Sequence, residues 1–510
     1  MISKSKLMAA CAAALLLGLS APAAKAADDA TKPVAAKKKD TSKDAKTPAP
    51  AAPPCGKKAD EGFWQRLNEA YASQSATPIF TPPKPGDPAP SRRGYPSPFD
   101  GPPYPTAEWQ LGGGPNIIGD PGALRDSPYP LMQALYDGPN GCWWYDSRIQ
   151  IYGWETVGGN ISTSRNTSRG PNANFPVVYD ERPNRLEQDQ FVIYIERMAD
   201  EFQTDHIDWG FRIAMVYGLD YRFMISRGFL DQQIIKHDRY AGLDLPMVYF
   251  NLYIPNIAQG MNITIGRIIS EPDIEQQLAP NNLMASHSIL YGFDDYTLWG
   301  LWTTTKLNDN WTLQAGIACG VDLAPWQSDV GRQPTGSIML QYIAPGQHDS
   351  WYAGMNSFNN GNFGYNNLQE CIASYTHKFN DKVWTTFEAQ YMYMKNATTA
   401  PTAAVPYQNA FFPVHGGFIP EGGILNYTCF RLADNTFLTF RNEWYDDSAG
   451  NRTGVATSYY ETSMGITWWP NKLLCIRPEI RYDHSCQLPA FDNGLKKDQI
   501  TIACDATIHF

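Results

Sequence analysis

The chain has 510 residues, of which 43% are hydrophobic and only 18% charged, and its formal net charge at pH 7 is −10. The acidic balance argues against a nucleic-acid-binding protein, because such proteins neutralise phosphates with clustered Lys and Arg. Past residue 26 no apolar run approaches the roughly 20 residues of a membrane-spanning helix. A helical membrane protein is therefore excluded, whereas a β-barrel, whose strands alternate apolar and polar residues, is not.

The first 26 residues read as a secretory signal peptide. Lys4 and Lys6 form a positive start, residues 7–19 an apolar stretch, and residues 24–26 an A-x-A cleavage site. We expect a cleaved signal and a mature chain that begins at Ala27.

Eight cysteines remain after that cleavage, and their spacing shows no C-x-x-C and no paired metal-ligand pattern. An exported chain can form disulfides. We nevertheless expect mostly unpaired thiols, because some of these cysteines fall on apolar strand faces, and we assign no connectivity.

Two segments lead from the signal peptide to the predicted barrel. Residues 27–60 are rich in Ala, Lys and Pro, and we expect them to be disordered. Within 61–142, apolar residues at helical spacing predict a short helix over 61–75. Residues 78–130 then hold 15 prolines, which favours an extended periplasmic stretch. The sequence leaves open whether this stretch spans the periplasm or packs in the barrel mouth as a plug.

From residue 143 to the end, strand-length segments alternate apolar and polar residues with period 2. We count sixteen candidate strands, with fourteen or eighteen as alternatives: 147–157, 186–197, 206–217, 246–254, 261–269, 294–306, 311–322, 335–343, 350–357, 367–379, 382–394, 423–431, 435–446, 457–468, 472–484 and 499–510. Long and short connections alternate between them, which is typical of short periplasmic turns and long outer loops. The sequence therefore predicts an all-β fold, a single antiparallel transmembrane β-barrel over 143–510 in the cell outer membrane.

The chain end carries the sharpest single signal. In the last strand, one face holds Ile500, Ile502 and Ile508 and ends on the aromatic Phe510. A final amphipathic strand that ends in Phe is typical of the signal that the barrel-assembly machinery of Gram-negative envelopes recognises. We therefore expect Phe510 to direct assembly.

Several segments resemble the putative beta-barrel porin-2 family, the OmpL-like outer-membrane barrels. The residues that carry the resemblance are Asp180 to Arg185, Asp205 to Arg212, Tyr217 to Arg222, Ala258 to Ile263, Leu278 to Asn282, Lys306 to Asp309 and Phe491 to Gly494. The resemblance covers about residues 140–510. It implies an outer-membrane channel without a catalytic motif, and it implies no particular substrate.

Strand parity places polar and charged residues on one inner wall, since charge is costly on the lipid face. We expect the pore to be lined by Arg148, Gln150, Asp208, Arg212, Arg441, Glu443, Glu461, Arg477, Glu479, Arg481 and Asp483. The alternative, which is compatible with a pore, is a packed ion-pair network that fills and stiffens the lumen.

The third long connection, residues 270–293, carries Glu271, Asp273 and Glu275. General porins fold their third outer loop inward, and an acidic constriction there favours cations. The alternative is a solvated outer loop.

We therefore expect a porin-like channel for passive diffusion of small hydrophilic solutes, with no catalytic residue, cofactor or metal. One alternative is a structural or adhesive barrel that is plugged. The other is a hydrolase at the barrel rim, for which only the runs 348–350 and 483–485 offer Asp, His and Ser. Expected partners are outer-membrane lipids, the assembly machinery and small solutes, without nucleic acid. Solute identity, ion selectivity and homo-oligomerisation stay open.

Overall fold

The computed structural model describes residues 55–78, 128–168, 170–201, 203–270, 274–327, 334–345, 348–359, 368–380, 382–397 and 417–510. The predicted signal peptide, most of the predicted disordered segment and most of the proline-rich stretch lie outside these residues. Glu271 and Asp273 also lie outside them. Among the described residues, no helix is long and apolar enough to cross a membrane.

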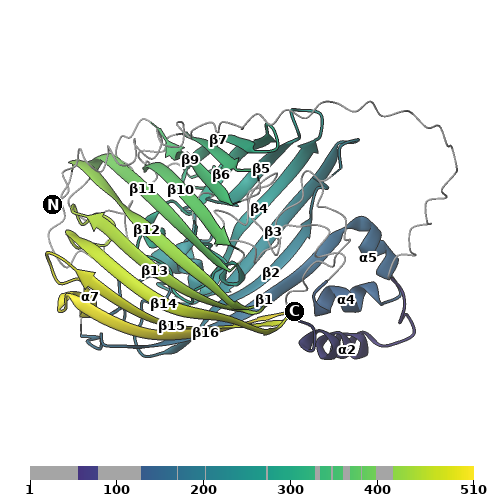
Figure 1. Cartoon of the computed structure of the whole chain (residues 1–510), viewed down its shortest axis with the longest axis horizontal. Helices are drawn as coiled ribbons and strands as arrows, with labels where there is room; N and C mark the ends of the chain where they lie inside the picture. The colour runs from purple at the N-terminus through teal and green to yellow at the C-terminus, as the bar shows by residue number, and fades with distance from the viewer. Residues whose placement is uncertain are drawn as a thin grey trace, which may run out of the picture.

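Sixteen antiparallel strands close into one barrel, which confirms the predicted architecture and strand count (Figure 1). Each strand pairs with its sequence neighbours, and the last strand pairs with the first. The strands are Ile149–Ser162 (β1), Leu186–Arg197 (β2), Asp208–Gly218 (β3), Gly242–Ile254 (β4), Met261–Ile269 (β5), Thr297–Lys306 (β6), Trp311–Val321 (β7), Thr335–Ile343 (β8), Asp349–Phe358 (β9), Gln369–Asn380 (β10), Val383–Ala397 (β11), Gly417–Ala433 (β12), Thr436–Asp447 (β13), Thr457–Asn471 (β14), Leu474–Ser485 (β15) and Asp498–His509 (β16).

Burial alternates most regularly in β16. Its inward residues, such as Thr501 and His509, are buried, whereas outward Ile500, Ile502 and Ile508 are 45%, 53% and 47% exposed. An apolar exposed face beside a polar buried one is the pattern of a barrel surrounded by lipid.

Several strand bounds differ from the sequence prediction, most of all in β12, which begins six residues before the predicted 423. Two of the differing starts have a local cause. β4 begins at Gly242 and runs through Pro246, which lies where the β3–β4 register skips a residue. A proline is tolerated there because a bulge does not require its missing N–H. β6 begins at Thr297, because a 3₁₀ turn, Tyr291–Phe293 (η3), ends the preceding loop. The other short helical turns, Asp220–Phe223 (η1), Gln232–Ile235 (α6), Ala279–Asn281 (η2) and Phe491–Gly494 (α7), also lie in long loops.

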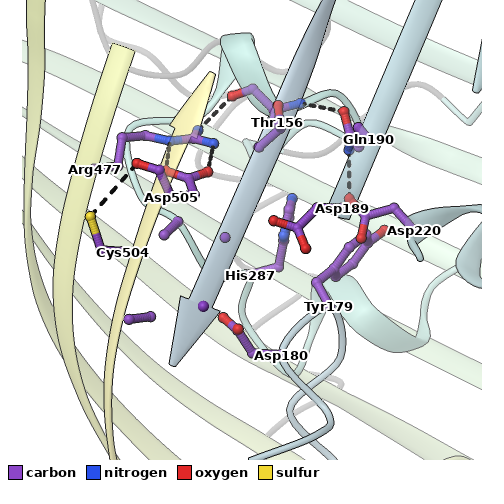
Figure 2. A pocket seen from close by; sticks show the side chains of 15 residues that line it. Thr156, Tyr179, Asp180, Asp189, Gln190, Asp220, His287, Arg477, Cys504 and Asp505 are labelled. Carbon is purple, nitrogen blue, oxygen red and sulfur yellow. Dashed lines mark hydrogen bonds and ion pairs between the residues drawn. The ribbon is translucent and has the colours of Figure 1, made fainter. Parts of the chain in front are cut away.

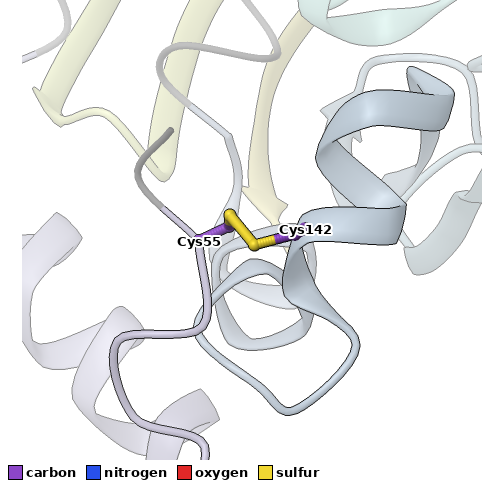
Figure 3. Close-up of a disulfide and its surroundings, with 2 residues drawn as sticks. All are labelled: Cys55 and Cys142. Carbon is purple, nitrogen blue, oxygen red and sulfur yellow. A yellow bond between two sulfur atoms is a disulfide. The ribbon is translucent and has the colours of Figure 1, made fainter. Parts of the chain in front are cut away.

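Three helices lie beside the barrel end that carries the C-terminus (Figure 1). They are Phe63–Ser75 (α2), where a short helix was predicted, Pro130–Tyr136 (α4) and Gly141–Ser147 (α5). A disulfide joins Cys55 to Cys142 and so connects the irregular segment before α2 to α5 (Figure 3). The other described cysteines are free thiols: Cys319, Cys371, Cys429, Cys475, Cys486 and Cys504.

The segment before β1 enters the mouth of the barrel at this end. Tyr129 is buried and stacks on the inward-facing His509, with ring centroids 4.5 Å apart. The Lys472 ammonium, from the β14–β15 turn, donates to the Pro128 carbonyl at 2.9 Å. The described part of the proline-rich stretch therefore packs in the barrel mouth.

Candidate functional site: an inward-folded loop held by the charged wall

The connection between β5 and β6 lies inside the barrel. Ile274, Leu278, Ile289 and Leu290 are almost completely buried and belong to the same apolar cluster as inward-facing strand residues such as Trp302. Residues 274–293 of this loop are therefore folded inward, and they do not form a solvated outer loop. We call it the inner loop.

Three arginines from the barrel wall bind carbonyl groups of the inner loop. Arg441, on β13, donates from Nη1 to the Ser286 carbonyl at 2.6 Å. Arg477, on β15, donates to the carbonyls of Ala279 and Asn282. Arg481, four residues further along β15, donates to the carbonyl of His287.

Carboxylates from the same wall accept the amides of the inner loop. Glu479 accepts the Ser286 N–H at 2.9 Å, and Glu443 accepts the N–H groups of Ile289 and Leu290. Glu388, on β11, accepts the Ile274 N–H at 2.7 Å. A buried backbone needs a partner for nearly every polar group. The charged wall supplies these partners, which allows an irregular loop to lie inside the barrel.

The charges of this wall are also paired with each other. Arg441 lies 3.1 Å from Glu275, 3.2 Å from Glu461 and 3.3 Å from Glu479. Arg481 pairs with Asp483 at 2.8 Å, and Arg477 pairs with Asp505. Burying these ions would be very unfavourable without such partners. The wall therefore holds three sets of buried ion pairs, around Arg441, Arg477 and Arg481.

Of the residues predicted to line the pore, Arg148 is half-buried and the other ten are buried. The seven from β13, β14 and β15 surround the inner loop. The remaining four lie elsewhere: Asp208 accepts from Arg148 and from Arg197 near the barrel mouth, Arg212 pairs with Glu196, and Gln150 bonds the Tyr136 hydroxyl.

Glu275 was predicted as a constriction acid, and it lies on the inner loop as expected. Its carboxylate is bound by Arg441 and accepts from the Tyr427 and Ser288 hydroxyls. The predicted cation preference therefore rests on the charges of Glu271 and Asp273, because Glu275 is already neutralised by its partner. That preference stays a prediction.

The Asp, His and Ser runs do not bring their side chains together. Asp483 pairs with Arg481, His484 contacts Asp498 at 2.8 Å, and the Ser485 hydroxyl donates to the Leu488 carbonyl. In the other run, Asp349 contacts His377 at 2.7 Å.

Sequence reasoning missed a second polar site, a small cavity that is partly open to solvent (Figure 2). Its lining includes Asp180, Asp189, Asp220 and Asp505 together with His287 and Arg477. The register of β1 and β2 shifts between Thr156 and Val157, leaving Asp189 opposite no partner. Such a bulge redirects a side chain, so Asp189 faces the cavity together with its neighbour Gln190. Sequence parity alone assigns these neighbours to opposite faces.

The model of one protein family, described as putative beta-barrel porin-2, OmpL-like, matches residues 148–510. The chain belongs to this family. It is therefore a porin-like outer-membrane β-barrel, and the resemblance noted from its sequence segments is confirmed. No match was found among the curated proteins.

Solved outer-membrane channels are similar in outline. An anion-selective porin from Comamonas acidovorans has a TM-score of 0.47 at 11% identity, covering 71% of this chain and 99% of its own. The channel DcaP of Acinetobacter baumannii and Salmonella typhi OmpF each have a TM-score of 0.43 at 11% identity, covering 71% of this chain and 97% of their own. These scores carry no information about which solutes cross this barrel.

Proposed function

We propose that this porin-like barrel allows passive diffusion of small hydrophilic solutes past a fixed constriction formed by the inner loop. The observation that carries the proposal is the two-sided hold on this loop. Arginines of β13 and β15 bind its carbonyls, and glutamates of β11, β13 and β15 bind its amides. A loop held along its length keeps the size of the passage constant.

The chemistry of the wall suits polar solutes. Polar and charged side chains make up the wall around the inner loop, and we expect a permeating solute to exchange water for hydrogen bonds with polar groups there. The three arginines that hold the inner loop each have a carboxylate partner, so the wall carries both signs of charge.

A plugged structural barrel is the second candidate, and one observation favours it. Tyr129 and Met132 are buried at the barrel mouth, where Tyr129 stacks on His509. The same segment is tied to α2 by the Gln74 side chain, which donates to the Pro128 carbonyl at 3.0 Å. A segment held in this way can narrow or block the mouth.

Single-channel conductance of the full mature chain in a planar bilayer separates the two candidates. A diffusion channel gives stepwise conductance. Glu443→Gln weakens the hold on Ile289 and Leu290, and we expect a noisier and larger conductance from this variant. The matched control is Glu155→Gln, because Glu155 accepts from Gln188 away from the inner loop. If correctly folded protein gives no conductance, the channel proposal is wrong and the plugged barrel takes its place.

A further inference from the structure

The cavity beside the inner loop presents several acceptors to its interior (Figure 2). Asp180 comes from the β1–β2 loop, Asp189 from the bulge of β2, and Asp220 from η1 after β3. No described hydrogen bond reaches the Asp189 carboxylate. Oδ1 of Asp220 is buried without a hydrogen-bond partner among the described residues.

His287 adds another acceptor from the inner loop. Its side chain is only 5% exposed, and its Nε2 lies 2.8 Å from the Gln276 carbonyl. A carbonyl only accepts, so Nε2 carries the hydrogen and Nδ1 is left as a lone-pair acceptor. Nδ1 is buried and has no partner in the described part of the chain.

The side-chain donors that line the cavity are already used. Arg477 donates to Asp505 and to two inner-loop carbonyls. Gln190 donates to Asp220 at 2.7 Å and to the Gln277 carbonyl, and Tyr179 donates to the Gln277 side chain. Asp505 is matched by Arg477, which leaves Asp180, Asp189 and Asp220 without a cation. Buried acceptors without donors are unfavourable, so a ligand that fits here brings both donors and positive charge.

The arrangement does not suit a bare metal ion. Within the described residues, no group of three or more His, Cys, Asp or Glu side chains is placed to hold one. An ammonium group donates over about 2.7–2.9 Å, which is longer than a metal–oxygen bond, and its N–H groups point in different directions.

We propose that this cavity binds a small protonated amine, whose three N–H groups donate to Asp189, Asp220 and Nδ1 of His287, while Asp180 adds negative charge beside them. The site lies inside the barrel, so the inference deepens the proposed channel function by naming a class of solute that pauses there. Gly158 belongs to the site, because a Cβ at this position would collide with the Asp189 carboxylate.

Calorimetric titration of the purified full mature barrel in detergent tests the proposal without requiring conductance. Methylammonium chloride is the probe, tetramethylammonium chloride lacks N–H donors, and calcium chloride represents a metal ion. We expect saturable binding of methylammonium alone. The double variant Asp189→Asn/Asp220→Asn should weaken it at least about tenfold, because hydrogen bonds to charged groups are lost.

Two further variants keep the test decisive. Gly158→Ala leaves every charge in place but displaces Asp189, and we expect it to weaken binding as well. Asp205→Asn removes an exposed carboxylate far from the cavity lining and should leave binding unchanged. Absent binding, equal binding of tetramethylammonium, tighter binding of calcium, or unchanged affinity in the cavity variants each overturns the proposal. Binding by a barrel that does not conduct would keep this site and discard the proposed channel function.

Discussion

Arg441 illustrates how single residues stabilise the interior. Its guanidinium is completely buried and contacts three carboxylates as well as the Ser286 carbonyl. Removing one partner from a buried ion network leaves uncompensated charge, which typically costs about 3–5 kcal/mol. We expect Arg441→Met to lower the free energy of unfolding by about this amount, as measured by urea titration in detergent. Arg185→Met, at an exposed loop position, should change it by less than about 0.5 kcal/mol.

The carboxyl group of Asp180 should make the stability of the folded protein depend on pH. Burial, followed by the nearby charge of Glu479, raises the pKa of this loop carboxyl to about 7. Asp505 and Glu187 add to the repulsion, and a hydrogen bond from Asn160 opposes it. The folded protein thus holds this proton more tightly than the unfolded chain does. The contribution of this proton to the free energy of unfolding is fully present below the pKa of the unfolded chain, near 3.8. It is lost as pH rises through the folded-state pKa of about 7.

The comparison is between thermal midpoints of the wild type and Asp180→Asn at pH 5 and pH 8. From pH 5 to pH 8, we expect the thermal midpoint of the wild type to fall further than that of the variant. Equal losses would show that the charge of Asp180 is compensated by groups outside this set.

At the scale of elements, the positions of the strands could be predicted from the sequence. The groups that their inward side chains bind could not. Period-2 alternation identifies inward residues such as Arg477 and Glu479, because one face of each strand contacts lipid. It cannot show that these side chains bind the backbone of the inner loop, since that contact depends on the closed barrel. The bulge at Asp189 could not be predicted from the alternation of apolar and polar residues. An unpaired extra residue changes which residues of the strand face inward. Glu388 followed ordinary parity on its strand and could have been found.

The helices before β1 are held together in part by a disulfide, so their stability can be tested by removing it. The Cys55–Cys142 disulfide closes a long stretch of chain, and cross-links of this kind typically stabilise by about 2–4 kcal/mol. We expect the double variant Cys55→Ser/Cys142→Ser to speed hydrogen exchange in α2 and α4, while the amides of the barrel strands keep their protection. Cys319→Ser, which removes a free thiol, is the control. Unchanged exchange in α2 would mean that packing alone holds these helices.

For the whole molecule, closure of the barrel depends on its two ends. The N–H of Phe510 donates to the Gly153 carbonyl at 3.0 Å, and its ring stacks on Phe191 with centroids 5.5 Å apart. We expect Phe510→Asp to lower the yield of folded barrel, because a charge replaces an outward aromatic. Heat-modifiability on gels measures this yield, and Phe510→Leu should retain most of it. A normal yield from the Asp variant would show that the terminal aromatic is dispensable.

The position of the inner loop along the chain has a consequence for the order of assembly. The loop precedes β6, yet the groups that hold it come mainly from β13 and β15, and the contacts between Glu479 and Ser286 span 193 residues. A growing barrel that lacks its last quarter therefore has an inner loop without these partners. Insertion of the final strands completes the wall and fixes the passage in one step. We therefore expect an incomplete barrel to have a wider and less selective passage than the complete one, because its inner loop is not yet held.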